Sequence, residues 1–270
     1  MKRFWLLFLL IASCGPLQRS SPFSEHTNSK SDHLNDRAIN GLQRLDQTPQ
    51  DIVLVAIADS HQNYDDLTTV VSSANQQQAD FVVHLGDFTN QGYNFEYDLF
   101  INRMKKLNLP FVVALGNHDT VTKGKSLYLR LFGDFNRMFE FRGYRFIILN
   151  NNNLDFKAHG GVDWDWLRRN VEASLLPIVL MYHINPDNTD YFTDSDRQTF
   201  DSIVIGSRVR LMLHGHHHVF ATSFANGILK HMVHRTEEAK WSRITLRANE
   251  ISIDYCQKLE CVRETTQAFP

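Results

Sequence analysis

The stretch Asp80-Phe81-Val82-Val83-His84-Leu85-Gly86-Asp87 contains a short apolar run that ends in a glycine and a carboxylate. An apolar run of this length, bounded by turn residues, is typical of a strand that is buried on both faces of a sheet. Four other runs are followed by an Asp, Asn or His, either at once or after one glycine: 52–58, 111–115, 178–182 and 209–213. Ligands bind at the carboxyl edge of open α/β sheets, so the runs predict a polar site there.

Helical patterns separate these runs and predict an α/β fold. Three amphipathic segments cover residues 65–74, 97–107 and 164–175. Alternation of strands and helices at this spacing indicates right-handed βαβ units and a mostly parallel sheet. Residues 139–149 have the pattern of a β-hairpin, and residues 240–255 contain two alternating strands. We therefore also expect a second sheet that contains antiparallel strands.

The bulk composition is that of a globular protein. The chain has 270 residues, of which 43% are hydrophobic and 21% charged, with a formal net charge of -2. This length suits one large domain or two small ones. The charge balance does not indicate a nucleic-acid groove or a polybasic membrane patch.

The first residues have the pattern of an export signal. Lys2 and Arg3 precede an apolar segment, 4–12, that is too short to span a bilayer. The signal ends in Ile11-Ala12-Ser13-Cys14, which resembles a bacterial lipobox. This resemblance implies a lipoprotein signal peptide over residues 1–13 and a lipid on the sulfur of Cys14. The alternative is an ordinary secretory signal with a chance cysteine.

Two features downstream of the signal each have two interpretations. Residues 14–50 are polar and predict a tether, but Leu34, Ala38, Leu42 and Leu45 inside it form a weak helical stripe. That stripe is either a short helix packed on the domain or no element at all. Cys256 and Cys261 are either bridged or free, because an exported chain can keep a disulfide.

Seven side chains at the strand ends are candidate metal ligands. Seven ligands are too many for one catalytic metal with an open position, whereas they suit two adjacent metals that share one carboxylate. A carboxylate directly after a glycine fits the shared position, because the glycine lets the backbone approach closely. The candidates are Asp59, His61, Asp87, Asn117, His183, His216 and His218.

These motifs, in this order, resemble those of the calcineurin-like metallophosphoesterases. The resemblance runs from about residue 52 to residue 255 and rests on five motifs: Asp59-x-His61, Gly86-Asp87, Gly116-Asn117-His118-Asp119, a lone His183, and Gly215-His216-x-His218. It implies two β-sheets sandwiched between helices, in a domain over residues 51–256 with a tail over 257–270. The segments 87–92 and 160–167 further resemble the class III cyclic nucleotide phosphodiesterase branch.

The resemblance also implies a role for each residue. Asp59, His61 and His218 correspond to ligands of one metal, and Asn117, His183 and His216 to ligands of the other. Asp87 corresponds to the bridging ligand. His118 corresponds to a histidine that binds no metal, contacts the phosphoryl group and protonates the leaving oxygen. The mixed imidazole and carboxylate donors leave Mn, Fe, Zn, Co and Ni as candidate ions.

One position departs from the pattern of many relatives. They carry an acid three residues after the bridging aspartate, where it orients the catalytic histidine, and this chain has Asn90 there. We expect the amide to orient His118 without stabilising its charged form, unless another carboxylate takes over that role. The position is not tyrosine, which argues against a purple acid phosphatase.

Other polar residues near the motifs are expected to be structural. His84 is expected in the core, His217 pointing away from both metals, and His231 in a strand or on the surface. Asp119 is expected to form hydrogen bonds and not to bind metal. The loop 150–153 either approaches the site or is an ordinary solvent loop.

The leading hypothesis is a dinuclear metal-dependent hydrolase of phosphomonoesters or phosphodiesters. Lipid on Cys14 would hold it in the bacterial cell envelope, facing the periplasm or the cell surface. The alternative is a non-catalytic metal-binding or surface-binding lipoprotein on the same fold. A family member that has lost its catalytic activity usually loses metal ligands as well. The complete set of seven candidate ligands therefore favours the enzyme.

Overall fold

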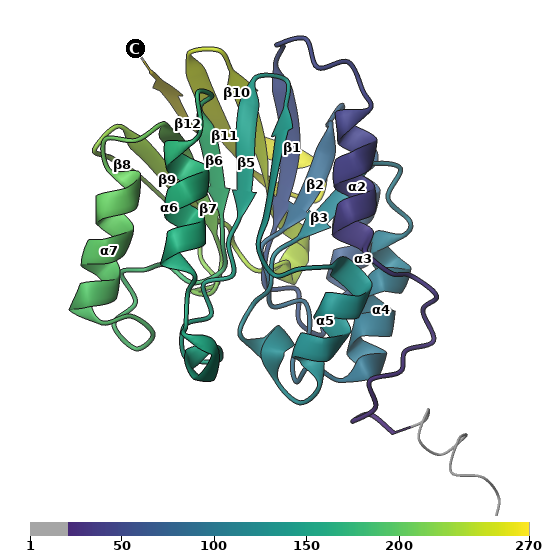
Figure 1. Ribbon diagram of the computed structural model, residues 1–270. Helices are drawn as coiled ribbons and strands as arrows, with labels where there is room; N and C mark the ends of the chain where they lie inside the picture. Colours follow the sequence, from purple (N-terminus) through teal and green to yellow (C-terminus); the bar gives the residue numbers. More distant parts are fainter. Residues whose placement is uncertain (1–20, 270) are drawn as a thin grey trace, which may run out of the picture.

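The computed structural model describes residues 21–269 as two six-stranded sheets with helices on their outer faces (Figure 1). One sheet has the order β12-β11-β10-β1-β2-β3, with β1 (Ile52–Ile57), β2 (Phe81–His84), β3 (Phe111–Val113), β10 (Lys240–Arg247), β11 (Glu250–Gln257) and β12 (Glu260–Ala268). The other has the order β4-β5-β6-β7-β9-β8, with β4 (Arg137–Phe141), β5 (Tyr144–Ile148), β6 (Ile178–Met181), β7 (Val209–His214), β8 (Ala221–Ala225) and β9 (Ile228–Met232).

The helices lie on the outer faces of this sandwich, except the first of them, which lies at the edge beside β3. They are α2 (Leu34–Gln43), α3 (Tyr64–Ala74), α4 (Asn94–Met104), α5 (Gly124–Phe132), α6 (Trp164–Glu172) and α7 (Asp194–Val204), with short 3₁₀ turns at His118–Thr120, Lys157–His159 and Glu237–Ala239. Within residues 21–269, none of them is long and apolar enough to cross a membrane. The predicted signal peptide and Cys14 lie outside the described residues.

The two-sheet α/β fold is confirmed, but the mostly parallel arrangement is wrong. β1, β2 and β3 are parallel, whereas β10, β11 and β12 extend the same sheet antiparallel from β1. The reason is that the C-terminal strands are joined by short turns, which require antiparallel pairing. The five predicted runs are therefore divided: β1, β2 and β3 carry three of them, and β6 and β7 in the other sheet carry two.

Apolar side chains fill the space between the sheets and the space under the helices. Alternate residues of a strand point to opposite faces, so each strand contributes to both layers. Ala56, Phe81 and Val83 face Phe146 and Leu213 between the sheets. The outer faces pack under α3, α4 and α5 on one side and under α6 and α7 on the other. Burial on both faces explains why these strands are continuous apolar runs.

Helix α2 belongs to the folded domain, so a tether does not extend to residue 50. Of the two interpretations of the stripe, the packed helix is the one found: Leu42 lies in the core between the sheets. The buried Asn35 side chain bonds both backbone groups of Val113, at 2.9 and 2.8 Å. In this way α2 covers the free edge of β3. The polar composition concealed this because only one face of α2 is apolar.

We expect Leu42→Ala to lower the free energy of unfolding by about 2–5 kcal/mol, because it leaves a cavity in the core. The matched control is Leu45→Ala. Leu45 belongs to the same stripe but lies past the end of α2 with 47% of its surface exposed, so the change should stay within about 0.5 kcal/mol. Urea unfolding of both variants measures the difference. Equal effects would mean that α2 does not contribute to the domain.

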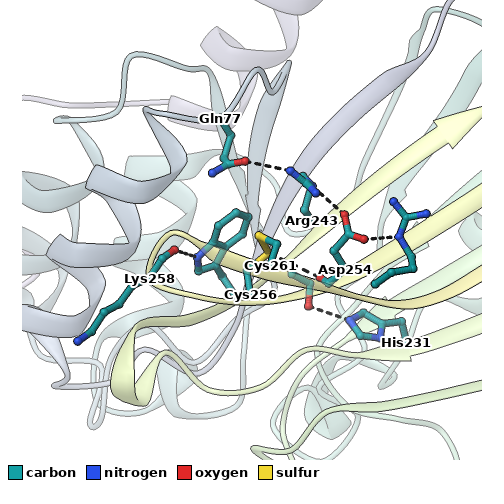
Figure 2. The surroundings of a disulfide bond; sticks show 10 residues. Gln77, His231, Arg243, Asp254, Cys256, Lys258 and Cys261 are labelled. Atoms are coloured by element: carbon teal, nitrogen blue, oxygen red, sulfur yellow. Dashed lines mark hydrogen bonds and ion pairs between the residues drawn. A yellow bond between two sulfur atoms is a disulfide. The ribbon is translucent and has the colours of Figure 1, made fainter.

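The C-terminal residues form a strand, not the expected tail. β12 pairs with β11 in a hairpin, and Cys256 lies opposite Cys261 in the register. The two cysteines are bridged (Figure 2). Sequence patterning missed β12 because most of its side chains are exposed at the sheet edge. The segment over 164–175 is also shorter than predicted, since α6 ends at Glu172 and Leu175 is exposed.

His231 of β9 is fully buried and joins the two sheets. Its Nε2 lies 2.8 Å from Oγ of Ser242 on β10, a contact drawn at His231 in Figure 2. Its Nδ1 lies 2.9 Å from Oγ1 of Thr222. Burial lowers the pKa of His231 to about 3. The imidazole is therefore neutral in the folded protein at pH values where it is charged in the unfolded chain.

This difference predicts acid sensitivity. The folded pKa lies below the unfolded value, so stability is complete above about pH 6.5 and is lost as the pH falls toward 3. The contribution of one such group has a slope of at most about 1.4 kcal/mol per pH unit. We expect His231→Gln to unfold with a pH dependence shallower by up to this amount between pH 6 and 4. Denaturant titrations at several pH values test it, and parallel curves for the two proteins would contradict it.

Candidate metal centre

The predicted ligands leave their strands in an unusual backbone conformation. Five of them have positive φ, which is uncommon for residues other than glycine and marks sites where the surrounding structure imposes strain. They are Asp59 (49°), His61 (42°), Asp87 (56°), His216 (78°) and His218 (62°). Such turns aim the side chains off the strand ends toward one another.

Gly86 shows why a glycine precedes Asp87. Its φ is +96°, and a Cβ atom at this position would lie 2.7 Å from the backbone nitrogen of Gly116 and 2.9 Å from Nδ1 of His183. A larger residue would push β2 away from β3 and displace a candidate ligand. The glycine therefore allows the two sheets to meet at the site.

One candidate metal group consists of Asp59, His61 and His218, whose ligand atoms all lie within 4.8 Å of one another. Asp59 Oδ1 lies 3.3 Å from Nε2 of His218. The Nδ1 atom of His61 lies 3.0 Å from the carbonyl oxygen of Thr89. Since a carbonyl only accepts, Nδ1 carries the proton and Nε2 is free to bind a cation.

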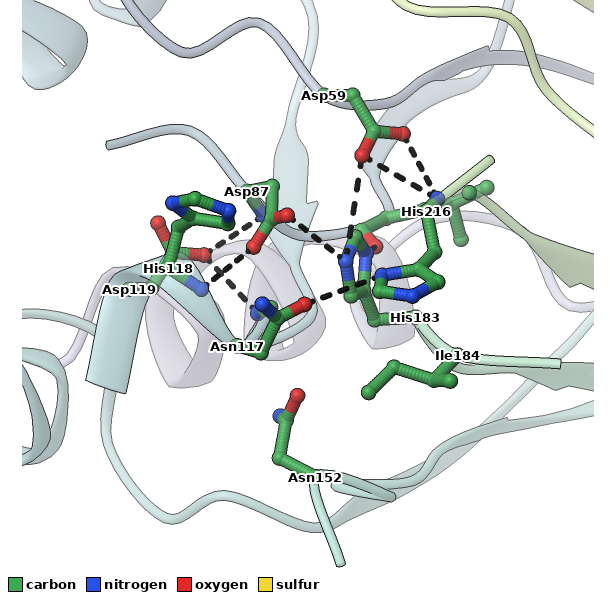
Figure 3. Close-up of polar contacts among 12 residues, drawn as sticks. Asp59, Asp87, Asn117, His118, Asp119, Asn152, His183, Ile184 and His216 are labelled. Carbon is green, nitrogen blue, oxygen red and sulfur yellow. Dashed lines mark hydrogen bonds and ion pairs between the residues drawn. The ribbon is translucent and has the colours of Figure 1, made fainter. Parts of the chain in front are cut away.

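The other group consists of Asp87, His183 and His216, again within 4.8 Å (Figure 3). Asn117 joins it, with its Oδ1 3.1 Å from Nδ1 of His216. Asp87 lies between the groups: its Oδ2 is 3.0 Å from Nε2 of His183 and 3.9 Å from Nε2 of His61. All seven predicted ligands thus converge, and Asp87 has the position expected of a bridging ligand.

The contacts of His183 indicate that a cation fits here. Its Nδ1 donates to the carbonyl of Leu85 at 2.8 Å, so in the neutral ring Nε2 presents a lone pair. That buried Nε2 has no hydrogen-bond partner among residues 21–269. It faces the carboxylate of Asp87, which also presents lone pairs. Two acceptors 3.0 Å apart are stabilised only by a cation or a proton between them.

The titration properties reflect the same arrangement. Burial by itself would lower the pKa of His183, but the nearby Asp87 carboxylate overrides this and raises it to about 9. Burial would raise the pKa of Asp87, but the charges of His183 and its neighbours lower it. Burial lowers the pKa of His216 to about 4, so its imidazole is neutral and able to bind a metal.

Asp119 holds the loops that carry the ligands. Its Oδ2 accepts from the backbone N–H groups of Asp87 and Gly116 at 2.8 and 2.9 Å, and its Oδ1 accepts from the N–H and hydroxyl of Thr89. The prediction that Asp119 forms hydrogen bonds and does not bind metal agrees with this position. It fixes the ends of β2 and β3 relative to each other.

Asn151 is a supporting residue that sequence reasoning did not identify. Its Oδ1 accepts from the backbone N–H groups of His183 and Ile184 at 3.2 and 3.1 Å, and its Nδ2 donates to the carbonyl of Ile184. Asn152 bonds the carbonyl of Leu115 at 2.9 Å. Of the two interpretations of the loop 150–153, proximity to the site is therefore the one found. The run of four asparagines was the only signal.

His118 is oriented by a backbone group and not by the side chain expected at Asn90. Its Nδ1 lies 2.9 Å from the carbonyl oxygen of Asn90, and its ring is edge-on to His61 with centroids 4.9 Å apart. A buried carboxylate supports this carbonyl indirectly. Glu96 accepts from the backbone N–H groups of Asn90, Gln91 and Tyr93 at 3.0–3.1 Å and so holds the loop in shape.

Two of the other histidines near the motifs are buried, as expected of His84, and two are exposed. His84 is buried, with Nε2 3.0 Å from Oγ of Ser60. His214 is buried and stacks on Tyr182. His217 is exposed between two ligands, and His159 is exposed on its loop. None of these four belongs to either of the two candidate metal groups.

Comparison with known proteins points to one family. The family model described as calcineurin-like phosphoesterase matches residues 52–220. A protein of Arcobacter nitrofigilis named "Probable glycerophosphodiester phosphodiesterase GpdQ" is 26% identical over 178 residues, which cover 61% of this chain and 60% of that protein. This chain thus matches less than two thirds of that relative.

Two solved structures share the fold. A dimetal phosphatase from Danio rerio matches with a TM-score of 0.63 and 12% identity, over 79% of this chain and 98% of that one. A purple acid phosphatase from yellow lupin matches with a TM-score of 0.65 and 11% identity, over 83% of this chain and 55% of that one. At these identities the likeness establishes the architecture alone.

Proposed function

The chain belongs to the calcineurin-like phosphoesterase family, and from this premise we propose that it is a two-metal hydrolase of phosphodiesters. The observation that carries the proposal is the position of Asp87 between two ligand groups, within 3.9 Å of both His61 and His183. A carboxylate shared in this way holds two cations close together without leaving their repulsion unbalanced. The ions are drawn from Mn, Fe, Zn, Co and Ni.

The residues of the site would have two roles, metal binding and proton donation. Asp59, His61 and His218 would hold one ion, and Asn117, His183 and His216 the other, with Asp87 shared. When bound, the ions supply Lewis acidity to the phosphoryl oxygens and lower the pKa of water. His118 keeps its Nδ1 on the Asn90 carbonyl, which leaves its Nε2 free to donate a proton to the leaving oxygen.

A cavity beside the metal centre supports a diester as substrate. It has a volume of about 380 Å³ and is lined by residues of the loops 153–161 and 189–196. Tyr191 lines it and also places its ring against His216, with centroids 5.1 Å apart. A phosphodiester has a second alcohol group that needs such a space, whereas a small monoester does not. The name of the Arcobacter nitrofigilis relative also favours diesters.

A panel of substrates tests this proposal. The purified protein is supplied in turn with Mn²⁺, Fe²⁺, Zn²⁺, Co²⁺ and Ni²⁺ and assayed with matched nitrophenyl monoesters and diesters. We expect turnover that depends on metal, with diesters preferred. A preference for monoesters would overturn the diester assignment. Absence of turnover with every metal and substrate would support the non-catalytic alternative.

We further propose that lipid on Cys14 anchors the chain outside the cytoplasm. The lipobox-like residues 11–14 support this, and the Cys256–Cys261 disulfide fits an oxidising compartment. Incorporation of labelled palmitate into the protein, but not into Cys14→Ser, is the expected result. An unlabelled parent protein would show that the cysteine follows an ordinary signal by chance.

A further inference from the structure

Two exposed phenylalanines and the half-buried tyrosine between them form a surface patch, which we call the aromatic patch: Phe23, Tyr93 and Phe95. The ring of Phe23 is edge-on to Tyr93 with centroids 5.4 Å apart, and Tyr93 stacks on Phe95 at 5.6 Å. Phe23 is 59% exposed and Phe95 is 45% exposed. Neighbouring aromatic rings left in water are a feature of contact surfaces, and Tyr with its polar tip suits a membrane interface.

The aromatic patch lies at the metal-centre edge of the molecule. Tyr93 follows Asn90 by three residues, and Asn90 contacts His118. The carboxylate of Glu96 bonds the backbone N–H groups of both Asn90 and Tyr93, which ties the patch to the loop of the site. The aromatic patch and the loop that orients His118 therefore belong to one rim of the molecule.

The N-terminal segment is fastened to this same rim. The buried side chain of Asn94 donates to the carbonyl oxygens of Ser21 and His26 at 2.9 and 2.8 Å. The buried carboxylate of Asp98 accepts from the backbone N–H groups of Asn28 and Ser29 at 2.7 and 2.8 Å. Figure 1 shows this segment running from α2 to the end of α4 where that helix begins. Two buried polar residues thus fix where the chain leaves the domain.

From these observations we propose that the aromatic patch rests on a lipid bilayer and turns the metal-centre edge toward the membrane. The inference rests on the proposed lipid at Cys14. Cys14 lies seven positions before Ser21, and this length of chain reaches at most about 25 Å, so the anchored rim stays near the membrane surface. A bilayer is the occupant that this geometry favours, because the patch lies where the short connection to the lipid begins.

Site-directed fluorescence tests the orientation. Cys14 is acylated under the proposal and Cys256 is bridged to Cys261, so an introduced cysteine is the one free thiol of the chain. Phe95→Cys places a fluorophore in the patch. The matched control is Leu175→Cys: Leu175 is 83% exposed and lies just before β6 begins, at the opposite end of the strands from the metals. The full-length lipoprotein is reconstituted into phosphatidylcholine vesicles that contain a nitroxide lipid.

We expect at least twofold quenching of the label at position 95 and little change at position 175. Equal quenching at both positions, stronger quenching at 175, or failure of the protein to bind vesicles would overturn the inference. Turnover of a soluble nitrophenyl diester is measured in the same samples. Turnover without quenching at 95 would reject the orientation alone, whereas quenching without turnover would reject the proposed hydrolase alone.

Discussion

Asp87→Asn is expected to lower kcat for phosphodiesters by about 10³-fold or more and to reduce the metal content of both halves of the site. Oδ2 of Asp87 lies between Nε2 of His183 and Nε2 of His61. The substitution keeps the shape of the side chain but removes the charge that both cations would share. Oδ1 also accepts from the N–H of His118 at 2.9 Å, so the change further disturbs the proton donor.

Metal analysis and steady-state kinetics on the same preparation measure this effect. The matched control is Asp165→Asn, which removes an exposed carboxylate from the first turn of α6 and should leave both quantities unchanged. Loss of one ion with the other retained would show that Asp87 belongs to one site only. Full turnover in Asp87→Asn would remove the basis for a shared carboxylate, and a protein that binds metal without turnover in either form would be the non-catalytic alternative.

The site could be predicted because each ligand follows its strand directly in the sequence. Asp59, Asp87 and His183 stand at the ends of apolar runs whose burial follows from composition alone. The convergence of these ends depends on two sheets packing face to face, which local sequence patterns do not show. Those patterns predicted a mostly parallel sheet. In the structure, His183 at the end of β6 contacts Asp87 and Leu85, which follow β2 in the other sheet.

The supporting residues were harder to predict because their contacts are made to the backbone. Asn90 orients His118 through its carbonyl oxygen, which every residue has, so the identity of its side chain gave no information. Glu96 and Asn151 bond backbone N–H groups of loops that become neighbours only in the fold. Similarly, α2 and β12 bury few apolar residues of their own, and their positions depend on the sheet edge that they cover.

His118→Ala separates proton donation from metal binding, because the effect depends on the leaving group. We expect a loss of about 10²–10³-fold for diesters of simple alcohols, whose leaving oxygen needs a proton. The loss for nitrophenyl diesters should be about 10-fold or less, since nitrophenolate leaves without one. The metal content should remain that of the parent, because His118 is not among the seven candidate ligands.

Asn90→Ala is the matched control, and it also tests how His118 is oriented. Alanine keeps the backbone carbonyl that lies 2.9 Å from Nδ1 of His118, so activity toward both kinds of diester should stay within about threefold of the parent. A loss in Asn90→Ala as large as that in His118→Ala would show that the amide side chain orients the histidine. A loss in His118→Ala that is equal for alkyl and nitrophenyl diesters would mean that the imidazole binds the phosphoryl group and does not protonate the leaving oxygen, because only proton transfer depends on the basicity of that oxygen.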